Sequence, residues 1–280
     1  MLSPWIWQDF IATALKEDVG FGDITTQALI PPTDYGRLQI IAREPMTVAG
    51  LDSLMHTYHL IDSRVSVCLH ARDGQTIPPH TALASLTGPT QALLTGERVC
   101  LNILQRLSGI ATATAHIVAL LQDLPVTVLD TRKTTVGWRV FEKYAVSAGG
   151  ARNHRMRLDD AVLIKDNHIA AVGSVSGAIA RARQAVGPTV FVEVEVDTPE
   201  QMKEAVQARP DGILLDNMSV NQLREAVQWI DHRVWTEASG GITPDTVREI
   251  AETGVDAVSL GWLTHSVPAV DIGADWREAL

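Results

Sequence analysis

The stretch VTVLDTRKTTVGWRVFEKYAVSAGGARNHRMRLDDAVLIKDNHI, residues 126–169, decides the fold of this chain. It opens with a β-branched run, 126–129, that ends in the polar sequence DTRKT, and it closes with an apolar run, 161–164, that ends in KDNH. Short apolar runs bounded by polar residues are typical of buried strands in a parallel sheet. The stretch therefore predicts two such strands, separated by a helical segment and a glycine turn.

Basic residues are concentrated in this stretch, although the chain has a formal net charge of −10. Eight of the 23 Lys and Arg residues lie there: Arg132, Lys133, Arg139, Lys143, Arg152, Arg155, Arg157 and Lys165. We expect Arg139, Lys143 and Arg157 to lie on solvated helix faces. Three others, Arg132, Lys133 and Lys165, directly follow predicted buried strands, where a charge is costly unless it faces an opening. These three predict an anion-binding site.

The second half of the chain alternates apolar strands with amphipathic helices. The predicted strands are 126–129, 161–164, 190–196, 212–215, 233–236 and 256–260, and the predicted helices lie near 138–149, 174–186, 199–208, 219–229 and 244–253. This alternation favours parallel strands with right-handed crossovers. Because no dinucleotide-binding glycine fingerprint follows a strand, we predict a barrel and not an open sheet.

Polar residues follow most of these strands, and in a βα barrel those positions share one mouth, where active sites are built. The cationic candidates, suited to carboxylates or phosphates, are Arg132, Lys133, His154, Arg155 and Lys165. The carboxylates of Glu195 and Asp216 suit Mg²⁺. Glu193 lies on the same strand face as Glu195, and we expect it one layer lower in the barrel.

Two smaller features complete the predicted mouth. Ser239-Gly240-Gly241 precedes a helix predicted from Thr243, and Gly261 follows the last strand, so together they predict a phosphate-binding cup. A glycine turn before a helix is also a common structural feature, and a single histidine such as His154 is often structural. We expect His168 to fix its own loop.

The first 110 residues mix helices and strands without a regular repeat. Helices are predicted at 4–16, 51–60 and 90–122, and strands at 36–43, 65–69 and 82–86, with a turn-rich loop at 17–26. This mixture predicts a small α/β sandwich. Gly96 and Gly109 predict that the long helix bends or divides.

Composition excludes several classes of protein. The acidic balance argues against a general nucleic-acid or anionic-membrane binder. No apolar run reaches the length of a membrane span, and the N-terminus does not resemble a secretion signal. Cys68 and Cys100 lack metal-ligand spacing, and we expect both to be buried in a reducing cytoplasm.

A series of motifs along nearly the whole chain resembles those of the quinolinate phosphoribosyltransferase family. The motifs are GDITT at 22–26, TGER at 95–98, DTRKT at 130–134, GGARNHR at 149–155, LIKDNHI at 163–169, VEVEV at 192–196, LLDN at 214–217, SGGI at 239–242 and AETGVDAVSLGWLTHS at 251–266. Their number and order make the resemblance specific.

The resemblance implies an open seven-stranded α/β barrel with an N-terminal α/β sandwich domain. We place the sandwich at residues 1–110 and the catalytic barrel at 111–265, with the tail of about 266–280 a candidate to pack back on the sandwich. The implied reaction joins the phosphoribosyl group of phosphoribosyl pyrophosphate to the ring nitrogen of quinolinate. It releases pyrophosphate and CO₂ and gives nicotinate mononucleotide for NAD synthesis.

The resemblance also implies Mg²⁺ as cofactor and a cytoplasmic homodimer, with a hexamer as the alternative. Quinolinate would be held by Arg132, His154, Arg155 and Lys165, with Lys133 close to both substrates. Glu195 and Asp216 would serve the ribose and Mg²⁺, and the catalytic candidates are Lys133, Lys165, Glu195 and Asp216. The 5′-phosphate pocket would be lined by Ser239, Gly240, Gly241 and Gly261. Arg98, which the sequence alone places in a surface pair beside Glu97, would reach across the dimer into the partner's site.

The chain departs from the family pattern at Val136, Arg152 and Arg157, which puts the shape of the acid pocket in question. One alternative is a paralogue of the molybdate-transport-associated type or one acting on another heterocyclic acid. A nicotinate-type enzyme would bind a single carboxylate, and the number of cations favours two. A non-enzymatic barrel that binds a phosphate ligand predicts loss of Lys133, Lys165, Glu195 or Asp216, and all four are present.

Overall fold

The computed structural model describes residues 2–277 and divides the chain into two compact units. Unit 1 is built from the described parts of Met1–Ala115, Tyr144–Gly150 and Val267–Leu280, and unit 2 from His116–Lys143 and Ala151–Ser266. The sequence-based division at 110 and 265 assigns Tyr144–Gly150 to the barrel, whereas these residues cluster with unit 1.

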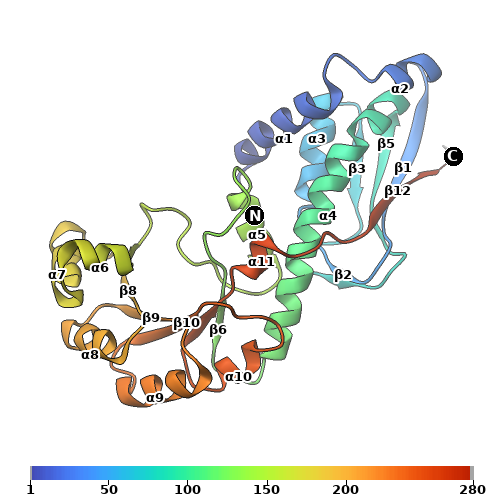
Figure 1. Cartoon of the computed structure of the whole chain (residues 1–280). Coiled ribbons are helices and arrows are strands. Elements are labelled where there is room, and N and C mark those ends of the chain that lie inside the picture. Colours follow the sequence, from blue (N-terminus) through green and yellow to red (C-terminus); the bar gives the residue numbers. More distant parts are fainter. Residues whose placement is uncertain (1, 278–280) are drawn as a thin grey trace. The chain divides into compact units, whose positions relative to one another are not determined.

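Unit 1 contains a four-stranded antiparallel sheet in the order β12-β1-β5-β3 (Figure 1). Its strands are β1 (Tyr35–Ala42), β3 (Ser66–Leu69), β5 (Ala82–Pro89) and β12 (Ile272–Arg277), and a separate pair is formed by β2 (Met46–Thr47) and β4 (Thr76–Ile77). The helices are α1 (Pro4–Val19), α2 (Ile24–Leu29), α3 (Asp52–Ile61) and α4 (Thr90–Leu120), the last of which continues into unit 2. The C-terminal segment thus supplies an edge strand beside β1.

The core of unit 1 lies between this sheet and the helices α3 and α4. Buried side chains of β1 and β5 meet Leu54 and Tyr58 of α3 and Leu93 and Leu104 of α4. The hydroxyl of Tyr58 donates to the carbonyl of Leu93 at 3.1 Å, which satisfies the one polar group that the ring buries. The predicted two-layer α/β sandwich is confirmed.

Three predictions for unit 1 are wrong in detail. The loop predicted at 17–26 overlaps α2, whose N-cap is Asp23: its carboxylate accepts from the Thr26 amide at 2.9 Å. The helix predicted to bend or divide is one continuous helix, because Gly109 is a packing site: a Cβ there would lie 2.3 Å from the Pro268 carbonyl. Cys68 is exposed on β3, an edge strand, whereas Cys100 is buried as expected.

Helix α4 is long and apolar enough to cross a membrane by length and composition alone. Half of its most apolar stretch is buried, and Cys100, Leu101 and Leu104 belong to the core of unit 1. This is the pattern of a helix at the centre of a protein core.

Unit 2 contains the βα repeat as a parallel sheet in the order β6-β11-β10-β9-β8-β7. Its strands are β6 (Thr127–Leu129), β7 (Val162–Ile164), β8 (Val192–Val196), β9 (Gly212–Asp216), β10 (Trp235–Ser239) and β11 (Ala257–Ser259). A parallel bridge between Leu129 and Arg152 adds a seventh, single-residue position beside β6. The predicted open barrel is confirmed, with its seventh strand reduced to this bridge.

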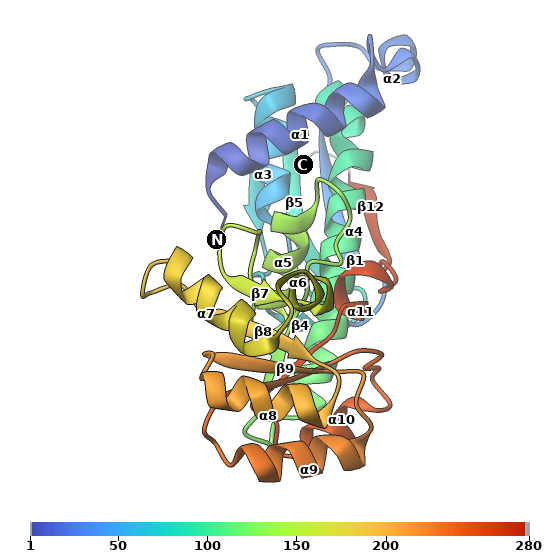
Figure 2. The same ribbon diagram turned by 60° about the vertical axis from the view of Figure 1, so that its left-hand side comes forward.

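Helices of unit 2 cover the outer side of the sheet, as Figure 2 shows for α7, α8 and α9. They are α5 (Arg139–Ala148, shared with unit 1), α6 (Asp166–Val172), α7 (Val175–Ala185), α8 (Pro199–Ala208), α9 (Val220–Ile230), α10 (Val247–Ala251) and α11 (Trp262–His265). The Thr198 hydroxyl caps α8 by accepting from the Gln201 amide at 3.2 Å. The last predicted helix starts at Val247 and not near Thr243, because residues 243–246 form a turn first.

Candidate active site

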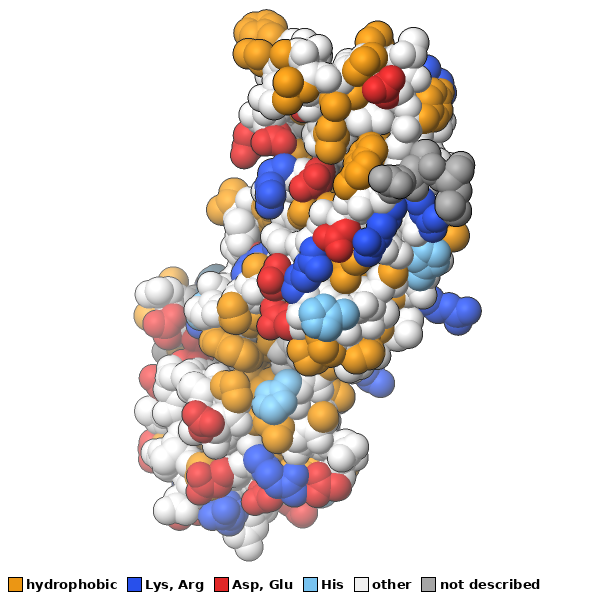
Figure 3. Space-filling view, turned by 90° about the vertical axis from the view of Figure 1, so that its right-hand side faces the viewer, with side chains coloured by type: hydrophobic (Ala, Val, Ile, Leu, Met, Phe, Trp, Pro, Cys, Tyr) orange, Lys and Arg blue, Asp and Glu red, His pale blue; other side chains and the backbone are white. Residues whose placement is uncertain are grey.

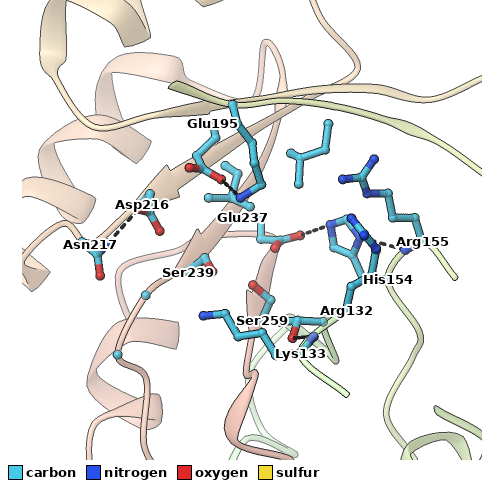
Figure 4. A pocket seen from close by; sticks show the side chains of 16 residues that line it. Arg132, Lys133, His154, Arg155, Glu195, Asp216, Asn217, Glu237, Ser239 and Ser259 are labelled. Atoms are coloured by element: carbon cyan, nitrogen blue, oxygen red, sulfur yellow. Dashed lines mark hydrogen bonds and ion pairs between the residues drawn. The ribbon is translucent and has the colours of Figure 1, made fainter. Parts of the chain in front are cut away.

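A cavity of about 440 Å³ opens at the C-terminal ends of the strands of unit 2 (Figure 4). Its lining brings together most of the predicted site residues: Arg132, Lys133, His154, Arg155, Lys165, Glu195, Asp216, Ser239, Gly240 and Gly241. It also contains Thr131, Leu163, Leu214, Asn217, Glu237 and Ser259. Side chains from separate strand ends therefore meet in one hollow, as a barrel mouth requires.

A buried ion pair positions the cationic side of this cavity. Asp130 directly follows β6, Lys143 reaches it from α5, and neither side chain is exposed to solvent. The Asp130 carboxylate also accepts from Asn153 Nδ2 at 2.6 Å and from the His154 amide at 2.9 Å, while Lys143 Nζ donates to the His154 carbonyl at 2.9 Å. We name these four residues the Asp130 cluster. It ties the segment after β6 to the segment 152–155.

The prediction that Lys143 lies on a solvated helix face is therefore wrong. Burial raises the pKa of Asp130 and lowers that of Lys143, and their mutual attraction and the surrounding hydrogen bonds oppose both shifts. Arg139 is half-buried and donates to the Thr134 hydroxyl at 3.0 Å, so it does not lie on a solvated helix face either. Arg157 is exposed as expected and pairs with Asp159, but it lies in a bend and not on a helix.

Two guanidinium groups give the cationic side its character. Arg132 Nε is buried and has no hydrogen-bond partner among the described residues. Arg155 donates to the Ala161 carbonyl at 3.0 Å, and burial together with the nearby charge of Arg132 lowers its pKa. A carboxylate between these groups would accept the unused Arg132 donor and relieve the repulsion between the two cations.

The opposite side of the cavity carries the two predicted acids. Glu195 Oε2 pairs with Lys165 Nζ at 2.7 Å, and Asn217 Nδ2 donates to Asp216 Oδ2 at 2.6 Å. Burial and the charge of Glu195 raise the pKa of Asp216. Two carboxylates that repel each other beside an open cavity are a donor set suited to a hard cation, so this pair fits Mg²⁺.

The loop Ser239-Gly240-Gly241 lies in close contact with Asn217. Gly240 has φ of 97°, and a Cβ on it would lie 2.2 Å from Asn217 Oδ1, so only glycine fits there. Asn217 donates its amide to the Ser239 carbonyl at 2.9 Å. Because α10 begins later than predicted and has only five residues, the expected helix N-terminus does not follow this loop directly.

Gly261 lies against Lys133, outside the lining of the cavity. A Cβ at Gly261 would lie 2.8 Å from Lys133 Cδ, and the Thr264 hydroxyl donates to the Lys133 carbonyl at 2.7 Å. Gly261 therefore leaves space for the lysine. His168 fixes its loop as expected, since its Nδ1 accepts from the Lys165 amide at 2.9 Å.

Glu237 was not predicted as a site residue, and Glu193 was expected only one layer below Glu195. Both are buried, and His154 Nε2 lies 3.1 Å from Glu193 Oε2 and 3.6 Å from Glu237 Oε2. The alternation of a strand contains the missing signal: Glu193 lies two residues before Glu195, and Glu237 two residues before Ser239, each on the face that points inward.

The remaining predicted positions lie elsewhere. Arg98 is exposed on α4, in unit 1. The departures at Val136, Arg152 and Arg157 are all exposed and do not belong to the lining of the cavity. Figure 3 shows one face of the molecule, on which Lys and Arg side chains are interspersed with Asp and Glu. That face offers no broad surface of one charge.

Comparison with known proteins gives consistent matches. The chain matches the family model for the C-terminal domain of quinolinate phosphoribosyl transferase over residues 110–275 and that for the N-terminal domain over residues 23–108. It is 45% identical over 259 residues to the probable nicotinate-nucleotide pyrophosphorylase (carboxylating) of Bacillus subtilis, covering 92% of this chain and 89% of that protein. The corresponding Mycobacterium leprae protein is 42% identical over 275 residues, with 96% of each covered.

A solved structure is similar over the same length. The nicotinate-nucleotide pyrophosphorylase of Francisella tularensis has a TM-score of 0.95 to this chain at 34% identity, covering 99% of this chain and 98% of that one.

Replacing Lys143 tests whether its buried ion pair with Asp130 stabilises the folded state. Lys143→Met keeps the volume but leaves Asp130 buried without its counter-charge, so the free energy of unfolding should fall by about 3–5 kcal/mol in urea denaturation. Adding Asp130→Asn should recover part of that loss, since both charges are then gone. Arg248→Gln is the control: it removes an exposed pair with Asp123 and should change stability little. Equal stability of Lys143→Met and wild type would show that the pair is not structural.

Proposed function

This chain belongs to the quinolinate phosphoribosyltransferase family, and we propose that the cavity at the mouth of unit 2 is where it carries out the family's reaction. The enzyme transfers the phosphoribosyl group of phosphoribosyl pyrophosphate to the ring nitrogen of quinolinate and releases CO₂, giving nicotinate mononucleotide and pyrophosphate for the synthesis of NAD. The observation that carries the assignment of the cavity is the unpartnered, buried Arg132 donor beside a second guanidinium.

Quinolinate binds on the cationic side in this proposal. Its two adjacent carboxylates are dianionic at neutral pH, and Arg132 and Arg155 offer the forked donors that carboxylates prefer. Lys133 and Lys165 line the same cavity, and Lys165 Nζ pairs with Glu195, so in this proposal the two lysines contact both substrates. The ring nitrogens of His154 are already engaged with Glu193 and with the Arg155 amide, which suggests that His154 acts mainly by orienting Arg155.

The phosphoribosyl group binds on the opposite side. Glu195 and Asp216 would hold Mg²⁺ and the ribose hydroxyls, and Ser239, Gly240 and Gly241 would enclose the 5′-phosphate. When bound, Mg²⁺ would neutralise the pyrophosphate that leaves. Loss of pyrophosphate builds positive charge on the ribose, which the nearby carboxylates stabilise. The pyridine nitrogen attacks that carbon, so the protein orients the two substrates and supplies no nucleophile of its own.

An assay over pyridine acids tests the proposal directly. With phosphoribosyl pyrophosphate and Mg²⁺, the purified protein should consume quinolinate and release CO₂, and chelation of the metal should stop the reaction. Lys133→Ala should lose turnover while its unfolding curve stays close to wild type, because this side chain is exposed in the cavity. Turnover of nicotinate or another heterocyclic acid with quinolinate ignored would contradict the substrate, and would favour the paralogue alternative.

We also propose that the enzyme is a cytoplasmic homodimer in which Arg98 completes the site of the partner subunit. Support comes from the family resemblance around TGER and from the exposure of the Arg98 side chain on α4. The two cysteines are free, which agrees with a reducing compartment.

Mixing inactive subunits tests the role of Arg98. Arg98→Ala and Lys133→Ala should each be inactive alone, because each removes a cation from every site. After exchange at equal concentrations, heterodimers should contain one intact site each, so activity should return to about a quarter of wild type. Failure of exchanged subunits to regain activity would place Arg98 and Lys133 in the same subunit's site, or Arg98 outside it.

A further inference from the structure

Glu237 lies in the floor of the cavity without a defined role. Its side chain is fully buried on β10, and neither carboxylate oxygen has a hydrogen-bond partner among the described residues. Figure 4 shows its carboxylate between the acids Glu195 and Asp216 on one side and His154 and Arg155 on the other. A buried carboxylate left without hydrogen bonds costs free energy, so its retention calls for a chemical explanation.

Protonation explains this carboxyl group better than a bound metal does. His154, Glu193 and Glu237 lie close enough together to hold an ion. However, His154 Nδ1 accepts from the Arg155 amide at 2.7 Å, so a neutral ring must have its proton on Nε2. That proton points to Glu193 at 3.1 Å, and a nitrogen that bears a proton cannot bind a metal.

The charges around Glu237 favour its neutral form. Burial and the carboxylate of Glu193 raise the pKa of Glu237 to about 7, against the opposing effect of His154. Asp130, the other acid that acts on it, raises the pKa further, and the polar neighbour Ser259 lowers it. Glu193 lies within hydrogen-bond distance of His154 Nε2, whereas Glu237 has no such partner in the part of the chain that the structure describes, so burial favours the protonated form of Glu237 below about pH 7.

A second cavity next to Glu237 can hold the water from which this residue regains its proton. This cavity, of about 560 Å³, is lined by Thr127, Phe191 and Trp235, near the N-terminal ends of the strands. Glu237 and His154 line both cavities. The oxygens of Glu237 are covered in this structure, so water from the second cavity reaches them only when the side chains over Glu237 shift.

The proposed reaction consumes one proton. After the ring nitrogen has bonded to the ribose, the bond between ring carbon C2 and its carboxylate breaks, and CO₂ leaves. The electron pair stays on C2, stabilised by the adjacent cationic nitrogen. A proton must then form the new C2–H bond, and water finally replaces the proton on its donor.

We propose that Glu237 is the acid that delivers this proton to C2, a role that rests on the proposed function. The cations hold the two carboxylates toward the arginines and the ring nitrogen faces the ribose side. Ring carbon C2 lies between the ring nitrogen and the carbon that bears the second carboxylate. In this orientation C2 lies above the floor where Glu237 is buried. Glu237 becomes a carboxylate in this step and regains its proton from water.

Glu237→Gln tests the role, because glutamine keeps the shape and has no acidic proton. Turnover should fall by about 10²-fold or more, the usual contribution of a general acid. Wild-type turnover should fall as the pH rises through about 7, where Glu237 loses its proton, and the variant should lack this limb. In the variant, CO₂ should add back to the unprotonated carbanion at C2. Some product should therefore leave with both carboxylates still attached, as a dicarboxylated mononucleotide detectable by chromatography.

Glu193→Gln provides a second, independent readout. Removing the charge of Glu193 should lower the pKa of Glu237, so the alkaline limb of the pH profile should move to lower pH without disappearing. Glu249→Gln, at an exposed position on α10, should leave the profile unchanged.

Folding gives a readout that does not depend on activity. The pKa of Glu237, about 7, is above the ordinary value of 4.5 for a glutamate, so the folded state binds the proton more tightly than the unfolded state. Wild-type stability should therefore fall as the pH rises from about 4.5 to about 7, and Glu237→Gln should reduce that fall.

Three results would overturn the proposal. The first is a Glu237→Gln enzyme with wild-type turnover and an unchanged alkaline limb. The second is a stoichiometric metal that wild type retains and the variant loses, measured by elemental analysis. The third is a wild type that leaves quinolinate unchanged, in which case the proposed function fails as well. An active wild type with an unaffected variant rejects the role of Glu237 alone.

Discussion

Asp130 directly follows β6, and Lys143 reaches it from α5 to form an ion pair that is fully buried from solvent. Such a pair is retained only where hydrogen bonds satisfy the remaining donors and acceptors, and here Asn153 and the backbone of His154 do so. The cluster joins β6 to the segment 152–155, which occupies the seventh, single-residue position of the barrel. Arg132 and Arg155 flank this cluster, so their spacing depends on it.

The mouth of the barrel is thereby divided into two halves with different supports. The cationic half is formed by the loop after β6 and the segment 152–155, which the Asp130 cluster joins. The anionic half stands on regular strands, where the register places Asp216 beside Ser239 and Glu195 beside Leu214. Lys165 and Glu195 form the ion pair that links the halves. In the proposed function, this division gives the two-acid ring and the charged sugar environments of opposite charge at short range.

Strand ends are where the sequence was most informative, because buried parallel strands must place their polar C-terminal neighbours at one edge. The lining of the cavity follows from that rule. Lys143 could not be predicted, since a lysine on an amphipathic helix is usually solvated and only the tertiary partner Asp130 explains its burial. Glu237 could not be predicted as a site residue, because a glutamate near a strand end does not by itself show that it is buried in the layer below the rim. Arg98 rests on the family resemblance alone, and no pattern in its helix separates it from a surface residue.

We propose that the Asp130 cluster holds the quinolinate half of the site in place. Calorimetric titration of the Asp130→Asn variant with quinolinate, at a temperature where the variant is folded, tests it most directly. The account predicts that quinolinate binds at least about tenfold more weakly than to wild type, equivalent to a loss of about 1.4 kcal/mol. Unchanged affinity for quinolinate in the folded variant would show that the arginines are held in place by something else.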